Sequence, residues 1–361
     1  MFPISNGVKK NYSQFILKSP IKVARGVKLS RFCTMKVGGP ADLFTTAKTK
    51  TELMEVLRLA HKLGIKYFVL AGGSNVVFPD KGWRGLVVRY TANRFVILSE
   101  VEESRDTKAR RSLHFGRDDR KKARNDGKVA LRWSPDTPSS YGVIGPMLRS
   151  ERSRICATVE AGAMLGEMVR KLLKQGLGGF NFLANIPGSV GGAIVGNAGC
   201  YGKETKDFLE EVEIFNVKTG RISIMKPSKL GFDYRHSKLK EHPELIVLSA
   251  IFKLAKVDPK QALKEIAAEK QSRLDKHPQG PSCGSWFKNP ERGVPAWKFI
   301  DQAGLRGYTL GKARISHKHS NFLVNCGGAT ATDIVKLSRL VKKKVSSQTG
   351  IYLTEEARLI N

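Results

Sequence analysis

Hydrophobic and polar residues follow a helical period in several stretches of the chain. One stretch starts after Thr49 and Glu52, which form a capping-box pair, and Gly64 ends it. Another opens with Asp258-Pro259, because aspartate caps a helix and proline fits its first turn. The period predicts helices over residues 53–63, 165–173, 259–267 and 332–349.

Short apolar runs between these helices predict β-strands. A run at 67–70 leads directly into a glycine-rich turn, and a second run lies at 85–89. Further strands are expected near 211–217 and 245–252, with a final strand at 351–353. Helices and strands are mixed without a strict strand-helix-strand repeat, so the pattern favours the α+β class.

Two segments depart from this patterning. Residues 1–27 are basic, and globular patterning begins at Lys28, so we expect a basic N-terminal extension. Between about 101 and 154 the chain holds mixed charges and turn-forming residues without a sustained apolar period. Such a segment cannot bury enough apolar surface to order itself, which predicts a mobile basic insertion.

The 361 residues carry a formal net charge of +31. A positive field attracts nucleic acid and other polyanions, and it also suits a substrate that contains a pyrophosphate. No RRM, KH or zinc-finger pattern accompanies the charge. We therefore expect nucleic-acid binding only as a non-specific consequence of the charge.

Composition also limits the compartment and the metal chemistry. No stretch approaches the roughly 18 apolar residues of a membrane helix, and residues 1–28 do not read as a signal peptide, so we expect no membrane partner and a cytoplasmic location. The five cysteines are scattered and form no CxxC pair. With only His317 and His319 close together, the sequence predicts reduced thiols and no metal site.

Glycine-rich stretches at 36–39, 71–75 and 186–193 are the candidate binding elements. Glycine lets the backbone approach a ligand and direct N–H groups at phosphate oxygens. No GxGxxG lies between a strand and a helix, and a near match to a P-loop has Glu204 where Ser or Thr should bind magnesium. The stretches indicate a dinucleotide bound outside a Rossmann fold, without NTPase chemistry.

Seven motifs follow one another along the chain. They are 71–78, 186–192 with 197–202, 234–237, 282–290, 303–307, 319–322 and 355–358. In residues and order they resemble the UDP-N-acetylenolpyruvoylglucosamine reductase family, over about residues 30–361 without the insertion. No tyrosine lies between Leu254 and His277. The chain therefore resembles the type of this family that lacks a tyrosine-bearing lid loop.

The resemblance implies an architecture of two domains. A two-lobed FAD-binding domain of the vanillyl-alcohol-oxidase (PCMH) type is expected over 28–254, including the insertion. A C-terminal α+β substrate-binding domain is expected over 255–361, and its last strand is expected to return to the first lobe. A monomer is the favoured oligomeric state.

The resemblance also implies an activity in peptidoglycan precursor synthesis. NADPH reduces bound FAD, and the flavin passes a hydride to the enolpyruvyl group of UDP-N-acetylglucosamine enolpyruvate, which yields UDP-N-acetylmuramate. Charge builds on the α-carbon and the carboxylate during this step, and the α-carbon then needs a proton. The expected cofactor is FAD, with NADPH as co-substrate.

Three residues match the family's catalytic positions. Arg235 matches the arginine that holds the substrate carboxylate, which a guanidinium can do with two hydrogen bonds. Ser285 matches the proton donor, and Glu356 matches the glutamate that supports the enol. The adjacent Glu355 leaves open which of the two glutamates takes that last role.

Other positions match the family's cofactor and substrate contacts. The FAD positions are Gly72, Gly73, Ser74, Asn75, Pro187, Gly188, Ser189, Gly191, Gly192, Asn197, Gly199 and Ile246. The substrate positions are Tyr234, Lys288 and Asn289. For the substrate pyrophosphate, which has no lid tyrosine here, the candidates are Arg273 and Lys276.

Two other functions fit parts of the sequence. Another flavin oxidase or dehydrogenase of the same superfamily would share the FAD loops, but it would have no need for Arg235, Ser285 and Glu356 together. A polyanion-binding protein on this scaffold would use the positive charge. It would purify without flavin and bind RNA in a salt-sensitive way.

Overall fold

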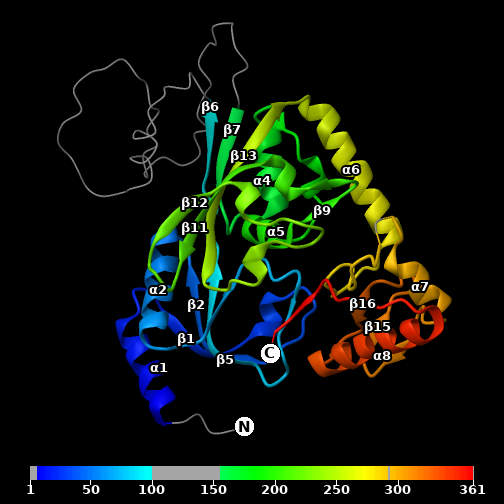
Figure 1. Ribbon diagram of the computed structural model, residues 1–361, viewed down its shortest axis with the longest axis horizontal. Coiled ribbons are helices and arrows are strands. Elements are labelled where there is room, and N and C mark those ends of the chain that lie inside the picture. Colours follow the sequence, from blue (N-terminus) through cyan, green and yellow to red (C-terminus); the bar gives the residue numbers. More distant parts are fainter. Residues whose placement is uncertain (1–5, 100–154, 292, 361) are drawn as a thin grey trace, which may run out of the picture.

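The computed structural model describes residues 6–99, 155–291 and 293–360. Figure 1 shows a first lobe in blue and cyan, a second lobe mainly in green, and a C-terminal domain in orange and red. The basic insertion predicted at 101–154 lies outside the described residues.

The first lobe is built on a sheet with the strand order β1-β2-β5-β3. Its elements are α1 (Asn6–Lys18), β1 (Val23–Lys28), β2 (Pro40–Ala47), α2 (Lys50–Lys62), β3 (Tyr67–Leu70) and β5 (Trp83–Tyr90). β1 and β2 are antiparallel, whereas β5 runs parallel to both β2 and β3. Phe15 of α1 and Leu57 of α2 share a hydrophobic core with Leu43 and Leu86, so both helices cover one face of the sheet.

The residues before Lys28 belong to this lobe, so the predicted extension over 1–27 is wrong from residue 6 onward. Phe15 is fully buried, the Nδ2 of Asn11 donates to the carbonyl oxygen of Leu63 at 3.0 Å, and the Tyr12 hydroxyl donates to Asp42 at 3.0 Å. The sequence of α1 reads as basic because its apolar face is short and lies among lysines. Two buried aromatic residues at positions i and i+3, Tyr12 and Phe15, are enough to dock the helix on the core of the lobe.

The predicted ends of two helices are confirmed by their caps. In α2, the Thr49 Oγ1 accepts from the backbone N–H of Glu52 at 3.1 Å. In α8 (Ala331–Thr349), Thr330 and Asp333 form a capping box, and Gly350 ends the helix with a φ of +72°. Each start is therefore fixed by a side-chain acceptor for free helical N–H groups.

The second lobe contains an antiparallel sheet with the order β12-β11-β13-β7-β6. Its strands are β6 (Phe95–Ser99), β7 (Ile155–Glu160), β11 (Leu209–Asn216), β12 (Ile222–Met225) and β13 (Leu245–Lys256), and β8 (Leu177–Gly178) also pairs with β13. The helices α4 (Leu165–Leu173) and α5 (Val190–Gly196) and the hairpin of β9 (Gly199–Cys200) and β10 (Lys203–Glu204) complete it.

Strand β6 had not been predicted, although it is an apolar run. It pairs antiparallel with β7, with Ser99 opposite Ile155. The segment outside the described residues therefore connects two neighbouring strands of one sheet. An insertion at such a connection leaves the order of the sheet unchanged.

The C-terminal domain follows the long helix α6 (Pro259–Lys276), which is capped by Asp258. It contains α7 (Ala296–Gln302), α8 and a small antiparallel sheet of β14 (Thr309–Leu310), β15 (Ala313–Ile315) and β16 (Leu323–Asn325). Residues 351–353 form no strand, so the predicted final strand is misplaced. Instead β17 (Arg358–Leu359) pairs with β4 (Val76–Val77) of the first lobe, so the end of the described chain lies against that lobe.

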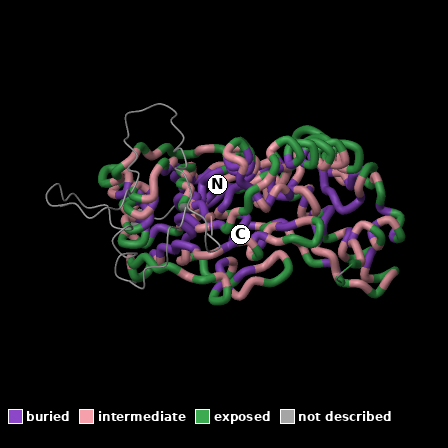
Figure 2. Tube along the Cα trace, turned by 90° about the horizontal axis from the view of Figure 1, so that it is seen from above, coloured by how far each residue is buried: buried purple, intermediate pink, exposed green. Residues whose placement is uncertain are grey.

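Two cores hold these parts together. One contains Leu43 of the first lobe and Phe252 of the second, so the lobes share a continuous interior. The other fills the C-terminal domain and also includes Met35 and Val77 of the first lobe. Figure 2 shows the buried positions along the inside of the molecule and the exposed positions at its rim. The lobes and the domain are therefore docked through apolar surface.

A helix must be long and apolar to cross a membrane. Among the helices of the described residues, none combines the length and the apolar character needed to cross a bilayer.

Candidate active site

The glycine loops at 71–75 and 186–192 touch each other where the lobes meet. A Cβ on Gly72 would lie 2.9 Å from the Cα of Gly188, and a Cβ on Gly188 would lie 3.0 Å from the Oγ of Ser74. Gly73 has a φ of +62°, and a Cβ there would overlap the carbonyl oxygen of Phe32. Only glycine permits these approaches, so the two backbones form adjoining walls.

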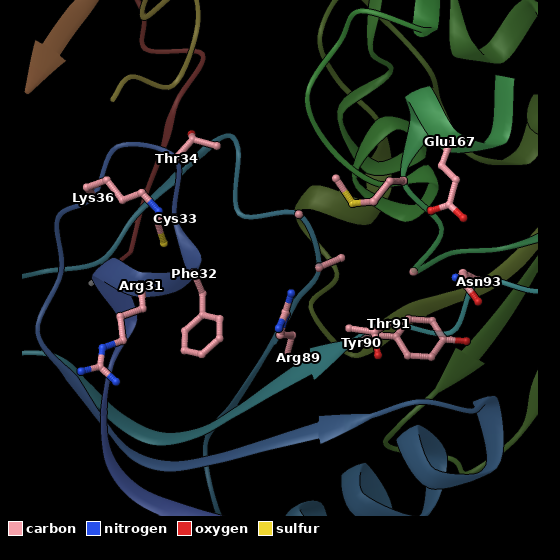
Figure 3. A pocket seen from close by; sticks show the side chains of 14 residues that line it. Arg31, Phe32, Cys33, Thr34, Lys36, Arg89, Tyr90, Thr91, Asn93 and Glu167 are labelled. Atoms are coloured by element: carbon pink, nitrogen blue, oxygen red, sulfur yellow. The ribbon is translucent and has the colours of Figure 1, made fainter. Parts of the chain in front are cut away.

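A cavity of about 380 Å³ opens beside the first loop (Figure 3). Ala71 and Gly72 line it from the first lobe, and Gly162 and Met164 line it from the second. Its charged lining residues are Arg31, Lys36, Arg89 and Glu167. Positive charge in excess, beside glycine-rich backbone, suits a ligand with a pyrophosphate.

Asn75 connects the first glycine loop to the C-terminal segment. Its side-chain Nδ2 donates to the backbone carbonyl oxygen of Glu356 at 3.1 Å, and its backbone carbonyl oxygen accepts from the N–H of Arg358 at 3.0 Å. Its Oδ1 is buried without a hydrogen-bond partner among the described residues. An unpaired buried acceptor costs about 1–3 kcal/mol, so this atom is suited to accept from a ligand.

The second loop is fixed to its own lobe. The Ser189 Oγ accepts from the N–H of Gly192 at 3.2 Å and so caps α5. A Cβ on Gly191 would lie 3.0 Å from the Cβ of Ala161, so only glycine lets the loop pack this closely. The glycine walls, the lining cations and the unpaired Asn75 oxygen fit FAD, which the residues of 72–75 and 187–192 would hold.

Three of the predicted FAD positions make other contacts in the structure. Asn197 is fully buried, and its Nδ2 donates to the carbonyl oxygen of Asp233 at 2.9 Å. The carbonyl oxygen of Gly199 accepts from the Nη2 of Arg235 at 2.6 Å. Ile246 is part of the core shared by the lobes. Asn197 and Gly199 thus hold the turn that carries Arg235, and the roles of all three toward FAD stay predictions.

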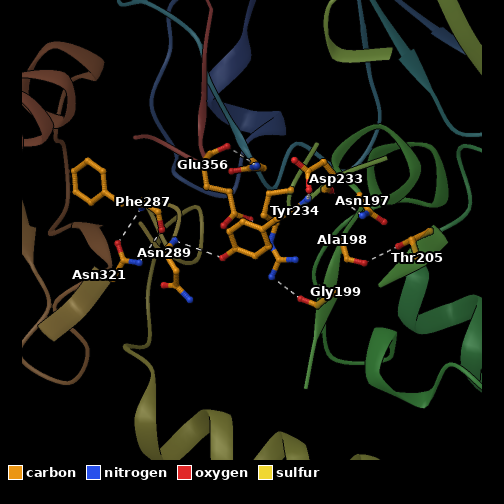
Figure 4. Close-up of polar contacts among 12 residues, drawn as sticks. Asn197, Ala198, Gly199, Thr205, Asp233, Tyr234, Phe287, Asn289, Asn321 and Glu356 are labelled. Carbon is orange, nitrogen blue, oxygen red and sulfur yellow. Dashed lines mark hydrogen bonds and ion pairs between the residues drawn. The ribbon is translucent and has the colours of Figure 1, made fainter. Parts of the chain in front are cut away.

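Arg235 is placed by a tight turn and several contacts. Its φ is +53°, and its carbonyl oxygen accepts from the Nζ of Lys240 at 2.6 Å. Its Nε lies 3.0 Å from the Oε1 of Glu356, and its guanidinium carbon lies 5.1 Å from the centre of the Tyr234 ring. Figure 4 shows Glu356, Tyr234 and Gly199 close to one another at this junction. The guanidinium therefore lies between the second lobe and the C-terminal segment.

The two consecutive glutamates face different partners. Glu356 pairs with Arg235, whereas Glu355 accepts hydrogen bonds from Ser338 at 3.0 Å and from Lys342 at 2.9 Å, both on α8. Successive side chains of an extended segment point to opposite sides, which explains the division. Geometry therefore favours Glu356 for the role that the sequence left open between the two.

Positive charge surrounds Glu356. Burial raises the pKa of Glu356 above its usual value, although Arg235, Lys240 and Lys288 act in the opposite direction. The pKa of Lys240 is lowered by burial and by the nearby cations Lys288, Arg358 and Arg235, which outweigh the pull of Glu356. Glu356 therefore lies among several cations, and this arrangement suits an anionic group of a substrate.

The loop at 285–289 brings the C-terminal domain to the same place. Ser285 precedes Trp286, whose carbonyl oxygen accepts from the N–H of Glu356 at 2.8 Å. The N–H of Asn289 donates to the Tyr234 hydroxyl at 3.5 Å. The structure thus gathers the predicted catalytic residues Arg235, Ser285 and Glu356, and the predicted substrate residues, at one junction of three segments.

Two residues at this junction had not been singled out in the sequence. Lys240 lies outside the motif at 234–237 and contacts Arg235 only because the chain folds back through a turn. Thr34 donates its hydroxyl to the carbonyl oxygens of Ser282 at 2.7 Å and Ser74 at 3.2 Å. No spacing marks either residue, because Lys240 reaches Arg235 across a turn and Thr34 contacts segments that are far away in the sequence.

Two cysteines near the first glycine loop, Cys33 and Cys283, are buried. Burial raises the pKa of Cys33 and that of Cys283 to about 12, so neither thiol is a ready nucleophile. None of the five cysteines, all of which lie in the described residues, is part of a disulfide. Within the described ranges, no cluster of three or more His, Cys, Asp and Glu side chains is arranged to hold a metal ion.

The fold and the site define a flavoprotein with a two-lobed FAD-binding domain, and residues 147–225 match the family described as FAD binding domain. Residues 275–360 match UDP-N-acetylenolpyruvoylglucosamine reductase, C-terminal domain. The chain belongs to the UDP-N-acetylenolpyruvoylglucosamine reductase family. The family predicted from the seven motifs, the α+β class and the FAD cofactor are thereby confirmed.

Similarity to known proteins extends over nearly the whole chain. The UDP-N-acetylenolpyruvoylglucosamine reductase of Geotalea uraniireducens is 33% identical over 92% of this chain and 92% of its own. That of Chlamydia abortus is 32% identical over 96% of this chain and 97% of its own. The crystal structure of UDP-N-acetylenolpyruvylglucosamine reductase from Thermus caldophilus matches with a TM-score of 0.66 and 29% identity, over 94% of this chain and 100% of the other.

Proposed function

We propose that this protein reduces the enolpyruvyl group of UDP-N-acetylglucosamine enolpyruvate to give UDP-N-acetylmuramate, a precursor of peptidoglycan, with FAD as cofactor and NADPH as electron donor. The relatives are named for this reductase activity. The observation that carries the proposal is the 3.0 Å ion pair of Arg235 and Glu356. It joins the second lobe to the C-terminal segment, next to the glycine loop that Asn75 links to Glu356.

Arg235 is proposed to hold the substrate carboxylate. A guanidinium offers two parallel hydrogen bonds to a carboxylate, and these strengthen as negative charge grows on the substrate. Lys240 and Lys288 add positive charge beside it. FAD, when bound, supplies the relay that accepts two electrons from NADPH and passes a hydride to the terminal vinyl carbon.

Ser285 is proposed to donate the proton that the α-carbon takes up after hydride addition. The hydride and this proton together saturate the double bond, and the serine oxygen regains its proton from water. The neighbouring cations favour the serine alkoxide and so make the hydroxyl a better acid. Glu356 pairs with Arg235 and so holds the guanidinium in place, and it is proposed to support the enol.

Arg273 is proposed to bind the substrate pyrophosphate. Its Nη2 donates to the Cys200 Sγ at 3.5 Å, so it lies beside the hairpin whose Gly199 contacts Arg235. Its Nε is buried without a partner in the described part of the chain. Lys276 lies one helical turn further along α6 and adds charge at its exposed end. Tyr234 and Asn289 complete the proposed substrate contacts.

Anaerobic turnover of UDP-N-acetylglucosamine enolpyruvate with NADPH tests the proposal. The wild-type holoenzyme should lose its flavin absorbance on mixing with NADPH and regain it when the sugar nucleotide is added. Ser285→Ala should bleach at the wild-type rate and regain its absorbance slowly. A wild-type flavin that NADPH does not bleach, or that stays bleached after the sugar nucleotide is added, would refute the activity.

A further inference from the structure

A buried chain of hydrogen bonds lies behind the proposed catalytic residues. The indole Nε1 of Trp286 donates to the Oγ of Ser338 at 2.8 Å, and this hydroxyl donates to the Oε1 of Glu355 at 3.0 Å. The Nζ of Lys342 donates to the other oxygen of Glu355 at 2.9 Å. The exposed fractions of Trp286 and Ser338 are 0% and 1%, so water does not replace the hydrogen bond between these two residues. The Ser338 hydroxyl accepts once and donates once, which fixes its direction.

The hydrogen bonds from Trp286 through Ser338 to Glu355 link two residues that each adjoin a proposed catalytic residue. Trp286 follows Ser285, and Glu355 precedes Glu356. The two backbones also contact each other, because the Trp286 carbonyl accepts from the Glu356 N–H at 2.8 Å and Phe287 forms an isolated β-bridge with Glu355. A movement at either end would therefore shift Ser285 and Glu356 relative to each other.

We propose that Glu355 and Ser338 are positioning residues that set the place of Ser285 relative to the Arg235–Glu356 pair. The inference rests on the proposed function and assigns a part of it to residues on the far side of the site. Glu355 bonds α8 rather than the residues that face the substrate, so it acts through its neighbours.

The charge of Glu355 is part of this arrangement. Burial raises the pKa of Glu355, but hydrogen bonds from Lys342, its own backbone and Ser338 lower it further, so its pKa lies below the usual value. The group is therefore an ionised acceptor at neutral pH. Without this acceptor the Ser338 hydroxyl can turn, and Trp286 loses the fixed acceptor of its indole N–H.

Glu355→Ala, Glu355→Gln and Ser338→Ala in the holoenzyme test the proposal, with the NADPH-dependent and the substrate-dependent steps measured separately. A loosened proton donor slows a reaction steeply, because an error of about 1 Å can cost a hundredfold. We expect the Glu355→Ala and Ser338→Ala proteins to react with substrate about tenfold slower, with flavin bleaching by NADPH unchanged. Glu355→Gln retains an oxygen that can accept from Ser338, so it should recover most of the rate.

Asp301→Asn is the matched control. It removes an ion pair with Arg306 in the same domain, and the side chains of Asp301 and Glu355 are similarly exposed, at 24% and 19%. The control should lose thermal stability about as much as Glu355→Ala while keeping both rates. A purely structural role for Glu355 would instead lower flavin content and both steps together, and glutamine would not rescue the rate.

Two failures are distinguishable in this experiment. Wild-type protein that does not turn over the sugar nucleotide would refute the proposed function. A wild-type enzyme that turns over normally, with Glu355→Ala at the same rate in both steps, would refute the positioning role alone.

Discussion

Gly72→Ala tests whether the contact between the glycine loops forms the FAD site. The added Cβ would lie 2.9 Å from the Cα of Gly188 and 3.2 Å from the backbone N of Ser189. Ordinary contacts begin near 3.4 Å, so the loops would have to separate by roughly 0.5 Å. Both neighbours are backbone atoms of a loop that Ser189 caps to α5, so the change cannot be absorbed by a side-chain rotation.

The expected loss can be stated as an affinity. Overpacking a closely packed contact costs about 1–3 kcal/mol. If this steric cost arises only in the FAD-bound protein, it weakens FAD binding about 5- to 140-fold, because 1.4 kcal/mol corresponds to a factor of ten in affinity. Gly72 has an ordinary φ, so backbone strain does not add to the steric cost.

The assay is flavin content after purification, followed by titration of the apoprotein with FAD through flavin fluorescence. Gly196→Ala is the control, because a Cβ on Gly196 meets nothing within 4 Å and the position is helical. Gly72→Ala that binds FAD within twofold of wild type would refute the inference that these loops form the cofactor walls. Equal losses in the two variants would show that the effect is not local to the contact.

Three further changes test the catalytic assignments and the electrostatics. Ser285→Ala should keep flavin bleaching by NADPH but lower steady-state turnover at least about 100-fold, since a positioned proton donor contributes 10²–10⁴-fold; NADPH consumption at wild-type rate would exclude Ser285 as the donor. Arg235→Lys keeps the charge but loses the planar fork, so kcat/KM should fall about 100-fold, and a value near wild type would show that one point charge is enough. Burial lowers the pKa of His277 from 6.5 to about 4, so the folded state favours the neutral imidazole ring. This preference stabilises the folded protein fully above pH 6.5, and the stabilisation is lost as the pH falls through 4. His277→Phe, which keeps an aromatic ring against Phe322, should lose less stability than wild type between pH 7 and pH 4 in urea unfolding; parallel losses would contradict the burial argument.

Elements with a strong local signal were predictable. The helix at α2 follows from its capping pair and its apolar period, and α6 follows from Asp258-Pro259. Elements held by contacts with distant segments were not. The helix α1 is docked by Tyr12 and Phe15 among lysines, and β17 is only two residues long and pairs with a strand far away in the chain.

The site also has a part that the sequence predicts and a part that depends on contacts between segments. Motif order identified Arg235, Ser285 and Glu356 one by one, but not the ion pair or the 2.8 Å backbone bond that bring them together. The choice between the adjacent glutamates depends on which one faces α8, and their sequence alone does not encode this. Lys240 reaches Arg235 across a turn, so no spacing marked it.

The return of the chain through β17 has a consequence for how loss of structure would be detected. Glu356 reaches Arg235 only when the C-terminal domain is docked on both lobes, whereas the glycine loops belong to the lobes alone. Partial undocking in mild denaturant would therefore abolish turnover while the protein is still yellow. For this enzyme, activity reports the assembly of the whole chain, and flavin colour reports only the assembly of its first two parts.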